Sequence, residues 1–185
     1  MKALKHFTLS WIVIILFIGL LFWFYQLTNS PYERVVEGET ITELHPDVQE
    51  AVETLIDRAD DIDIEVVITD GLRSEEEQDA LYARGREDGG NIVTHARAGE
   101  SYHNYGLAVD YAIRNQEGEI IWDIHYDGNN NGESDWFEVA EIAKDLGFEW
   151  GGDFNRFPDY PHLQMTFGLS ISELQRGYRP SVEHE

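Results

Sequence analysis

The chain of 185 residues carries a formal net charge of −23 and contains no cysteine. Such a negative chain is not expected to bind nucleic acid, because affinity for phosphate depends on Lys and Arg. The lack of cysteine excludes disulfides, thiol nucleophiles and thiolate-bound zinc, so any metal must be held by His, Asp or Glu. The 5 Trp, 9 Tyr and 9 Phe indicate a folded domain with a sizeable core.

The first predicted element is an apolar helix near the N-terminus. The run from Thr8 to Leu27 has no charged residue and about 20 positions, the length that crosses the hydrocarbon core of a membrane. Lys2 and Lys5 precede this run and Arg34 follows it, which predicts a cytoplasmic N-terminus and an external domain. We therefore expect residues 1–28 to form a cytoplasmic tip and an uncleaved transmembrane anchor. A cleaved signal peptide, which would yield a secreted protein, and a buried core helix are the alternatives.

Beyond the anchor, we expect a linker over residues 29–44, one domain over 45–176 and a C-terminal tail over 177–185. Hydrophobic periodicity and capping residues predict helices over 46–56, 74–82 and 136–146. Alternating and apolar runs predict strands over 64–69, 107–113, 119–126 and 161–167, with a hairpin turn at 115–118. Helices mixed with mostly antiparallel strands indicate an α+β fold in which helices flank a sheet.

Two histidines and one aspartate form the most informative pattern of the domain. His103 and Asp110 lie close together in the sequence, and His162 lies far downstream. Alternation along the two expected strands places Asp110 among small residues on one face and His162 on a polar face. If these strands are neighbours, the three side chains can converge. Two imidazoles and one carboxylate are a common ligand set for catalytic zinc, with a fourth position left for water.

A candidate general base stands just before the last histidine. Pro161 disfavours helical geometry at Tyr160, so Asp159 and His162 do not form the helical metalloprotease signature. A bend before the strand would instead turn Asp159 toward the metal. There its carboxylate could take a proton from water and pass it to the leaving amine. Glu149 and Asp153 are rival candidates for this role.

The motifs together resemble a known family. Ser-x-His-x-x-Gly-x-Ala-x-Asp at 101–110, followed by Asp-x-Pro-His at 159–162, resembles the VanY-type D-alanyl-D-alanine carboxypeptidase family of zinc peptidases. The segments 69–74 and 150–154 look like its L-alanyl-D-glutamate endopeptidase branch, found in bacterial cell-wall enzymes and phage endolysins. The resemblance covers residues 46–167 and implies the α+β zinc fold that is shared with hedgehog signalling domains.

The resemblance also implies roles for individual residues. It implies Zn²⁺ held by His103, Asp110 and His162, with Asp159 as the catalytic base. It further implies that Arg73 stabilises the oxyanion or the substrate carbonyl, and that Ser101 lies near the substrate. The implied activity is cleavage of peptidoglycan stem peptides between L-alanine and D-glutamate, on the outer side of the membrane. A D,D-carboxypeptidase of the same family and a non-catalytic zinc-containing binding ectodomain are the alternatives.

A second pattern matches the loop that binds calcium in EF-hands. Oxygen-bearing side chains fall at the ligand positions of the segment 127–138, with glycine at the sixth position: Asp127, Asn129, Asn131, Asp135 and Glu138. The expected flanking elements are a strand and a helix rather than two helices, so the segment is not a full EF-hand. We expect Ca²⁺ binding here, with a turn in which Asp135 caps the following helix as the alternative.

Overall fold

A five-stranded antiparallel sheet carries Asp110 and His162, two of the three predicted metal ligands. The computed structural model describes residues 2–28, 31–35, 41–86 and 91–182. Neighbouring strands follow the order β2, β3, β6, β5, and β4 pairs with the far end of β3. Their bounds are β2 (Glu65–Asp70), β3 (Ala108–Arg114), β4 (Ile120–Ile121), β5 (Glu149–Trp150) and β6 (His162–Gln164). The predicted α+β class and the antiparallel pairing are confirmed.

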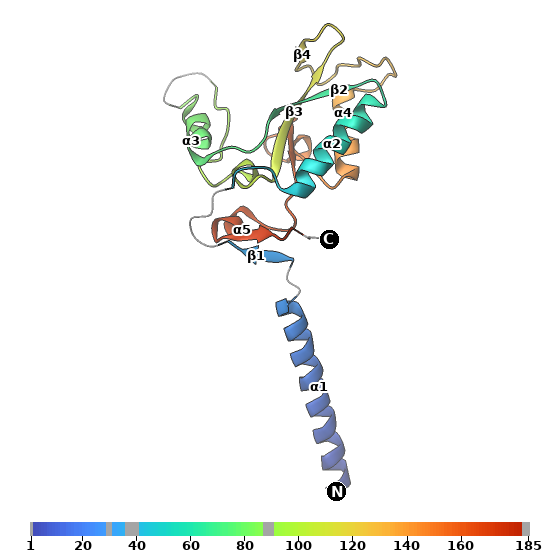
Figure 1. Cartoon of the computed structure of the whole chain (residues 1–185), viewed down its shortest axis with the longest axis vertical. Helices are drawn as coiled ribbons and strands as arrows, with labels where there is room; N and C mark the ends of the chain where they lie inside the picture. The colour runs from blue at the N-terminus through green and yellow to red at the C-terminus, as the bar shows by residue number, and fades with distance from the viewer. Residues whose placement is uncertain (1, 29–30, 36–40, 87–90, 183–185) are drawn as a thin grey trace.

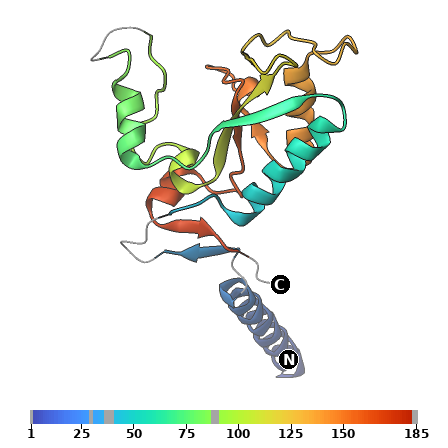
Figure 2. The same ribbon diagram turned by 45° about the horizontal axis from the view of Figure 1, so that its top comes forward.

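Helices cover one side of this sheet. In Figure 1, α2 (Pro46–Asp60) and α4 (Asp135–Asp145) lie together on one side, and α3 (Glu75–Ala83) lies on the other. Figure 2 shows α3 standing apart from the sheet and from the α2–α4 pair. The main core lies on the α2–α4 side. Successive side chains of a strand point to opposite faces of the sheet, so the residues of β3 face this core alternately. Tyr111 of β3 is fully buried on this side, with its ring 5.0 Å from that of Trp136. Asp110, the preceding residue, therefore faces the opposite side.

The local signals for helix ends are seen in the structure. Ser74 and Glu77 form the predicted capping box at the start of α3, with each side chain accepting a hydrogen bond from the other residue's backbone N–H. Gly147 follows the end of α4 with a φ of 96°, a conformation that a residue with a side chain rarely adopts. These caps place the ends of α3 and α4 close to the predicted limits.

Two of the predicted strands are shorter than expected. Only Ile120–Ile121 of the expected strand 119–126 is a strand, and only His162–Gln164 of the expected strand 161–167. Strands β4 and β6 pair with the same edge of β3. Strand β6 pairs with Ala108 to Asp110, and β4 pairs with Ile113 and Arg114. Each strand ends where its share of that edge ends, because a strand needs a neighbour for its backbone hydrogen bonds.

A second, two-stranded sheet joins segments from the predicted linker and tail. Its strands are β1 (Tyr32–Arg34) and β7 (Tyr178–Pro180), which pair antiparallel. The short helix α5 (Ile171–Gln175) precedes β7. Residues 29–30 and 36–40 of the predicted linker and residues 183–185 of the tail lie outside the described residues. The division into anchor, linker, domain and tail stays a prediction.

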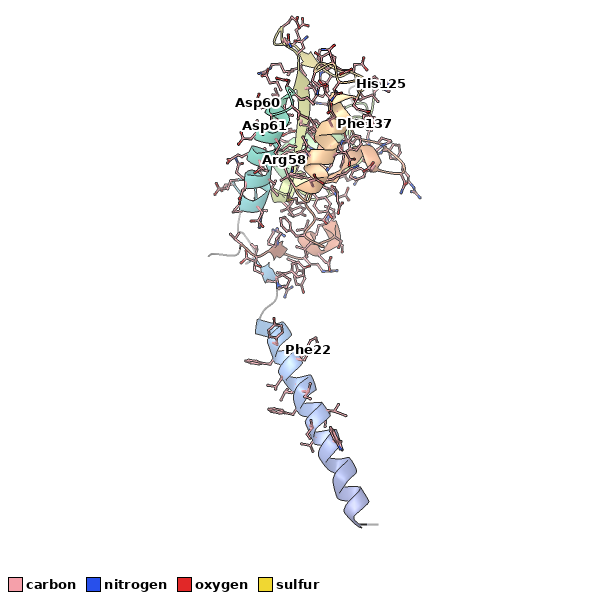
Figure 3. The ribbon with its side chains drawn as sticks, turned by 90° about the vertical axis from the view of Figure 1, so that its right-hand side faces the viewer. Phe22, Arg58, Asp60, Asp61, His125 and Phe137 are labelled. Atoms are coloured by element: carbon pink, nitrogen blue, oxygen red, sulfur yellow. The ribbon has the colours of Figure 1, made fainter. Side chains whose placement is uncertain are left out.

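Helix α1 (Lys2–Thr28) occupies the segment in which an anchor is predicted. It extends away from the rest of the chain in Figure 1, and Figure 3 shows Phe22 projecting from it. Within the part of the chain that the structure describes, no helix meets the length and hydropathy needed to cross a membrane. The predicted transmembrane anchor therefore has no support from the structure.

Candidate metal centre and active-site cleft

The register of two neighbouring strands brings the predicted metal ligands together. Asp110 of β3 pairs directly with His162 of β6, so both side chains lie on the same face of the sheet. His103 lies in the 3₁₀ turn Tyr102–Tyr105, and Gly106, with a φ of 67°, turns the chain from there into β3. A Cβ at Gly106 would come within 2.6 Å of the backbone oxygen of Glu43, so only glycine fits this turn.

The three side chains meet at a single point. His103 Nε2 and His162 Nδ1 each lie 3.3 Å from Asp110 Oδ1 and 3.2 Å from one another. The imidazoles are buried, with 2% exposure for His103 and 9% for His162. Among the described residues, this is the one group of His, Asp and Glu whose ligand atoms are close enough together to hold a metal ion.

Each imidazole is oriented by a hydrogen bond from its ring nitrogen that faces away from Asp110. His103 Nδ1 lies 2.7 Å from the backbone oxygen of Gly71, which can only accept, so Nδ1 is the protonated nitrogen of the neutral ring. The Glu149 carboxylate accepts hydrogen bonds from Gln164 Nε2 at 2.9 Å and from Thr166 Oγ1 at 3.0 Å. This leaves Gln164 Oε1 to accept from His162 Nε2, at 3.0 Å.

Both neutral imidazoles therefore present a lone pair to the Asp110 carboxylate. Three electron-rich atoms in mutual contact repel one another unless a cation lies among them. The donor set of two nitrogens and one carboxylate oxygen matches what zinc prefers. The buried cluster thus fits a zinc ion, with His103 Nε2, His162 Nδ1 and Asp110 Oδ1 as its ligands.

The electrostatics of the cluster keep Asp110 ionised. Burial acts to raise the pKa of Asp110, but when the imidazoles carry protons in place of a metal ion, their hydrogen bonds and positive charge hold this pKa well below the usual range. Burial acts to lower the pKa of His162, yet its hydrogen bonds with Asp110 and Gln164 and the Asp110 charge raise it above the ordinary value. Protons and a metal ion therefore compete for the same site.

A cleft is lined by His103, Asp110 and His162, and Asp159 lies in its wall. The predicted bend is present: Asp159 N donates to the backbone oxygen of Gly151 at 2.9 Å, and His162 N donates to the backbone oxygen of Asp159 at 3.1 Å. Burial, followed by the charge of Asp110, raises the pKa of Asp159. A carboxyl group with a raised pKa is suited to both taking and giving a proton.

The two rival bases are engaged elsewhere. Glu149 accepts the hydrogen bonds from Gln164 and Thr166 behind the metal cluster. Asp153 pairs with Lys144 at 2.8 Å on the surface. Of these three carboxylates, Asp159 is the one that lines the cleft.

Arg73 is held beside the cluster by fixed partners. Its Nη2 donates to Asp70 Oδ2 at 2.6 Å and lies 3.4 Å from Asp110 Oδ2. Its Nη1 donates to Oε1 of the fully buried Gln78, whose own Nε2 donates to the backbone oxygen of Ala96 at 2.7 Å. The positively charged guanidinium is thereby fixed next to the three predicted metal ligands.

The cleft around these residues has a volume of about 650 Å³. Its walls include Arg73, Ser101 and Asp159, together with the aromatic rings of Trp122 and Phe154. Ser101, predicted to lie near substrate, is thus in the cleft. The positioning partners Gln78, Gln164 and Glu149 were not recognised from the sequence in these roles, because each acts on a residue that only the fold brings near.

The predicted calcium loop uses its oxygen atoms internally. Asp127 Oδ1 accepts from the backbone N–H of Asn131, and Asp135 accepts from the backbone N–H of Gly128. Glu138 Oε1 accepts from Asn131 Nδ2 at 2.7 Å. These bonds hold the segment as a turn before α4, but the expected cap differs: Ser134 is the N-cap and Asp135 is the first residue of the helix. The structure gives the predicted calcium site no support.

Comparison with known proteins shows the family to which the chain belongs. A family model described as D-alanyl-D-alanine carboxypeptidase matches residues 94–165. The chain is 61% identical over 124 residues to the peptidoglycan L-alanyl-D-glutamate endopeptidase CwlK of Bacillus subtilis (strain 168), which covers 67% of this chain and 74% of that protein. It is 28% identical over 141 residues to the L-alanyl-D-glutamate peptidase of Listeria phage A118, covering 76% of this chain and 44% of the phage protein.

A solved structure shares the fold. DacB from Streptococcus pneumoniae D39 aligns with a TM-score of 0.50 and 20% identity, over 77% of this chain and 81% of that chain. The chain belongs to the D-alanyl-D-alanine carboxypeptidase family of metallopeptidases. The resemblance predicted from the motifs at 101–110 and 159–162 is thereby confirmed.

Proposed function

We propose that the protein is a zinc-dependent peptidase that hydrolyses the L-alanyl-D-glutamate bond of peptidoglycan stem peptides. The convergence of His103, Asp110 and His162 beside Asp159 carries the proposal, because three side chains able to bind a metal ion and a carboxylate suited to proton transfer line one cleft. The 61% identity to an L-alanyl-D-glutamate endopeptidase supports this choice of bond.

Zinc at this ligand set would supply Lewis acidity, which polarises a carbonyl group and lowers the pKa of water. Asp159 takes a proton from the water that adds to the peptide carbonyl carbon. It then returns this proton to the amine nitrogen as the carbon–nitrogen bond breaks. The raised pKa of Asp159 suits both transfers, since the group must change its protonation state twice in each cycle.

Arg73 stabilises the negative charge that develops on the carbonyl oxygen. Its hydrogen bonds to Asp70 and Gln78 fix the guanidinium before the reaction, so little reorganisation is needed as that charge forms. Ser101 lines the cleft, which supports its proposed contact with the bound peptide.

Product analysis on purified stem peptide tests this function. We expect the zinc-loaded protein to release L-alanine and a peptide that begins with D-glutamate. Release of D-alanine alone would instead support the D,D-carboxypeptidase alternative, and binding without any cleavage would support the non-catalytic ectodomain.

Replacement of Asp159 tests its proposed role as the base. We expect Asp159→Ala to lower kcat by about 10²-fold to 10⁴-fold while the zinc content stays the same, because Asp159 moves protons but holds no metal. Asp153→Ala, which removes a carboxylate engaged by Lys144 outside the cleft, is the control and should keep its activity. Equal activity of Asp159→Ala and the wild type would exclude Asp159 as the base.

The location of the protein stays a proposal. Peptidoglycan lies outside the cytoplasm, and the basic residues before the apolar run predict an external domain. Residues 1–28 are accordingly proposed to hold the domain at the membrane, facing the wall. Membrane fractionation of the full chain and of a form lacking residues 1–28 tests this, since an equal distribution of the two forms would rule it out.

Calcium binding by residues 127–138 likewise stays a prediction, open to calorimetric titration of the wild type and Asp127→Ala.

A further inference from the structure

An exposed tryptophan stands in the wall of the active-site cleft. Trp122 is 58% exposed and lines the same cleft as His162 and Asp159. It directly follows β4, whose pairing with β3 sets its place at the edge of the sheet. The Trp122 ring packs against the buried ring of Trp136, with centroids 6.2 Å apart. The indole thus contacts the core ring of Trp136 while more than half of its surface stays exposed.

A second aromatic ring lies near the metal-binding cluster. Phe154 also lines the cleft, and its ring centroid is 6.0 Å from that of His162. Exposed aromatic surface in a ligand cleft is expected to contact a ligand with apolar faces. The polar, acidic D-glutamate side of the substrate does not provide such a face. A sugar ring does, because its C–H groups form apolar faces while its hydroxyl groups point outward from the edge.

The chemistry of peptidoglycan places a sugar next to the bond in question. The stem peptide is attached through the amino group of its L-alanine to the lactyl group of N-acetylmuramic acid. One residue of extended chain spans about 3.3–3.6 Å. With the alanine and the lactyl group between them, the sugar lies within about 10 Å of the scissile bond. That distance is comparable to the width of a cleft of about 650 Å³.

We propose that Trp122 forms a subsite for the N-acetylmuramoyl sugar, so that the enzyme prefers stem peptides that are still attached to glycan. This inference rests on the proposed function, which places the scissile bond beside L-alanine. The indole stacks on one face of the sugar ring. Covering about 60 Å² of apolar surface in this way corresponds to about a tenfold gain in affinity.

Calorimetry on a form that binds without turnover tests the subsite. The zinc-loaded full chain with Asp159→Asn is titrated with N-acetylmuramoyl-L-alanyl-D-glutamate and with N-acetyl-L-alanyl-D-glutamate, which lacks the sugar. We expect the muramoyl ligand to bind about tenfold more tightly. Adding Trp122→Ala should remove this advantage, and Trp122→Phe, which keeps an aromatic face, should retain part of it.

Phe137→Ala is the matched control. Phe137 is an exposed aromatic residue on α4, on the side that also carries Arg58 of α2, and it lines a separate cavity (Figure 3). The sugar advantage should persist in this variant. Equal affinities for the two ligands, or an advantage that survives both Trp122 substitutions, would overturn the subsite. Failure of the wild-type enzyme to cleave the muramoyl ligand between L-alanine and D-glutamate would instead refute the proposed function, since the binding comparison needs no turnover.

Discussion

The hydrogen bonds behind His162 allow a quantitative prediction. Gln164→Leu keeps a side chain of similar length but removes the acceptor for His162 Nε2 and the donor to Glu149, which lie at 3.0 and 2.9 Å. The His162 ring would then lose the contact that sets its tautomer and its direction. Loss of such an outer partner lowers metal affinity by about 10-fold to 100-fold. This equals about 1.4–2.7 kcal/mol, within the range expected for leaving one buried polar group without its partner.

The dissociation constant for zinc, measured by competition with a chromophoric chelator, is the assay. Gln175→Leu is the control, because Gln175 donates to the backbone oxygen of Gly99 and has no contact with the metal cluster. Gln164→Glu combined with Glu149→Gln should restore affinity, since the exchanged amide and carboxylate can remake the same hydrogen bonds to His162 and Thr166. Unchanged zinc affinity in a folded Gln164→Leu protein would refute the argument.

Two further predictions concern the bend at Asp159 and the protonation of the cluster. A Cβ at Gly151 would come within 2.3 Å of the backbone oxygen of Asp159, so Gly151→Ala should displace Asp159. If Asp159 is the base as proposed, kcat should fall at least about tenfold, and a wild-type kcat would show that the bend tolerates the extra methyl group. Because the pKa of His162 is raised, zinc affinity should fall as pH drops through that pKa, whereas the stability of the metal-free protein should fall as pH rises through it. Chelator competition and thermal melts from about pH 8 to about pH 5 measure these opposite trends, and a zinc affinity independent of pH would contradict the first.

Much of the fold could be read from local patterns. Helix periodicity and capping depend on residues within one or two turns, so the helix starts at Pro46 and after Ser74 follow from neighbouring residues alone. Alternation along a strand is likewise local, and it places Asp110 on the face opposite Tyr111. The motifs around His103 and His162 pointed to the family because their spacing is distinctive.

The sequence does not reveal which strand lies beside which, or at what register. Asp110 pairs with His162, and β4 and β6 both pair with the same edge of β3. These contacts join residues far apart in the sequence, and they depend on the packing of the whole sheet. The pairing of β1 with β7 joins opposite ends of the chain in the same way.

The residues that position the active-site side chains also depend on contacts between distant segments. Glu149 reaches His162 through Gln164, and Gln78 reaches the loop at Ala96 through a hydrogen bond across the cleft wall. The residue types narrow the candidate ligands and bases to a few positions, because zinc and proton transfer demand particular chemical groups, and the family resemblance selects among them. Which amide or carboxylate orients each of those groups depends on contacts between distant segments, and such contacts exist only once the chain has folded.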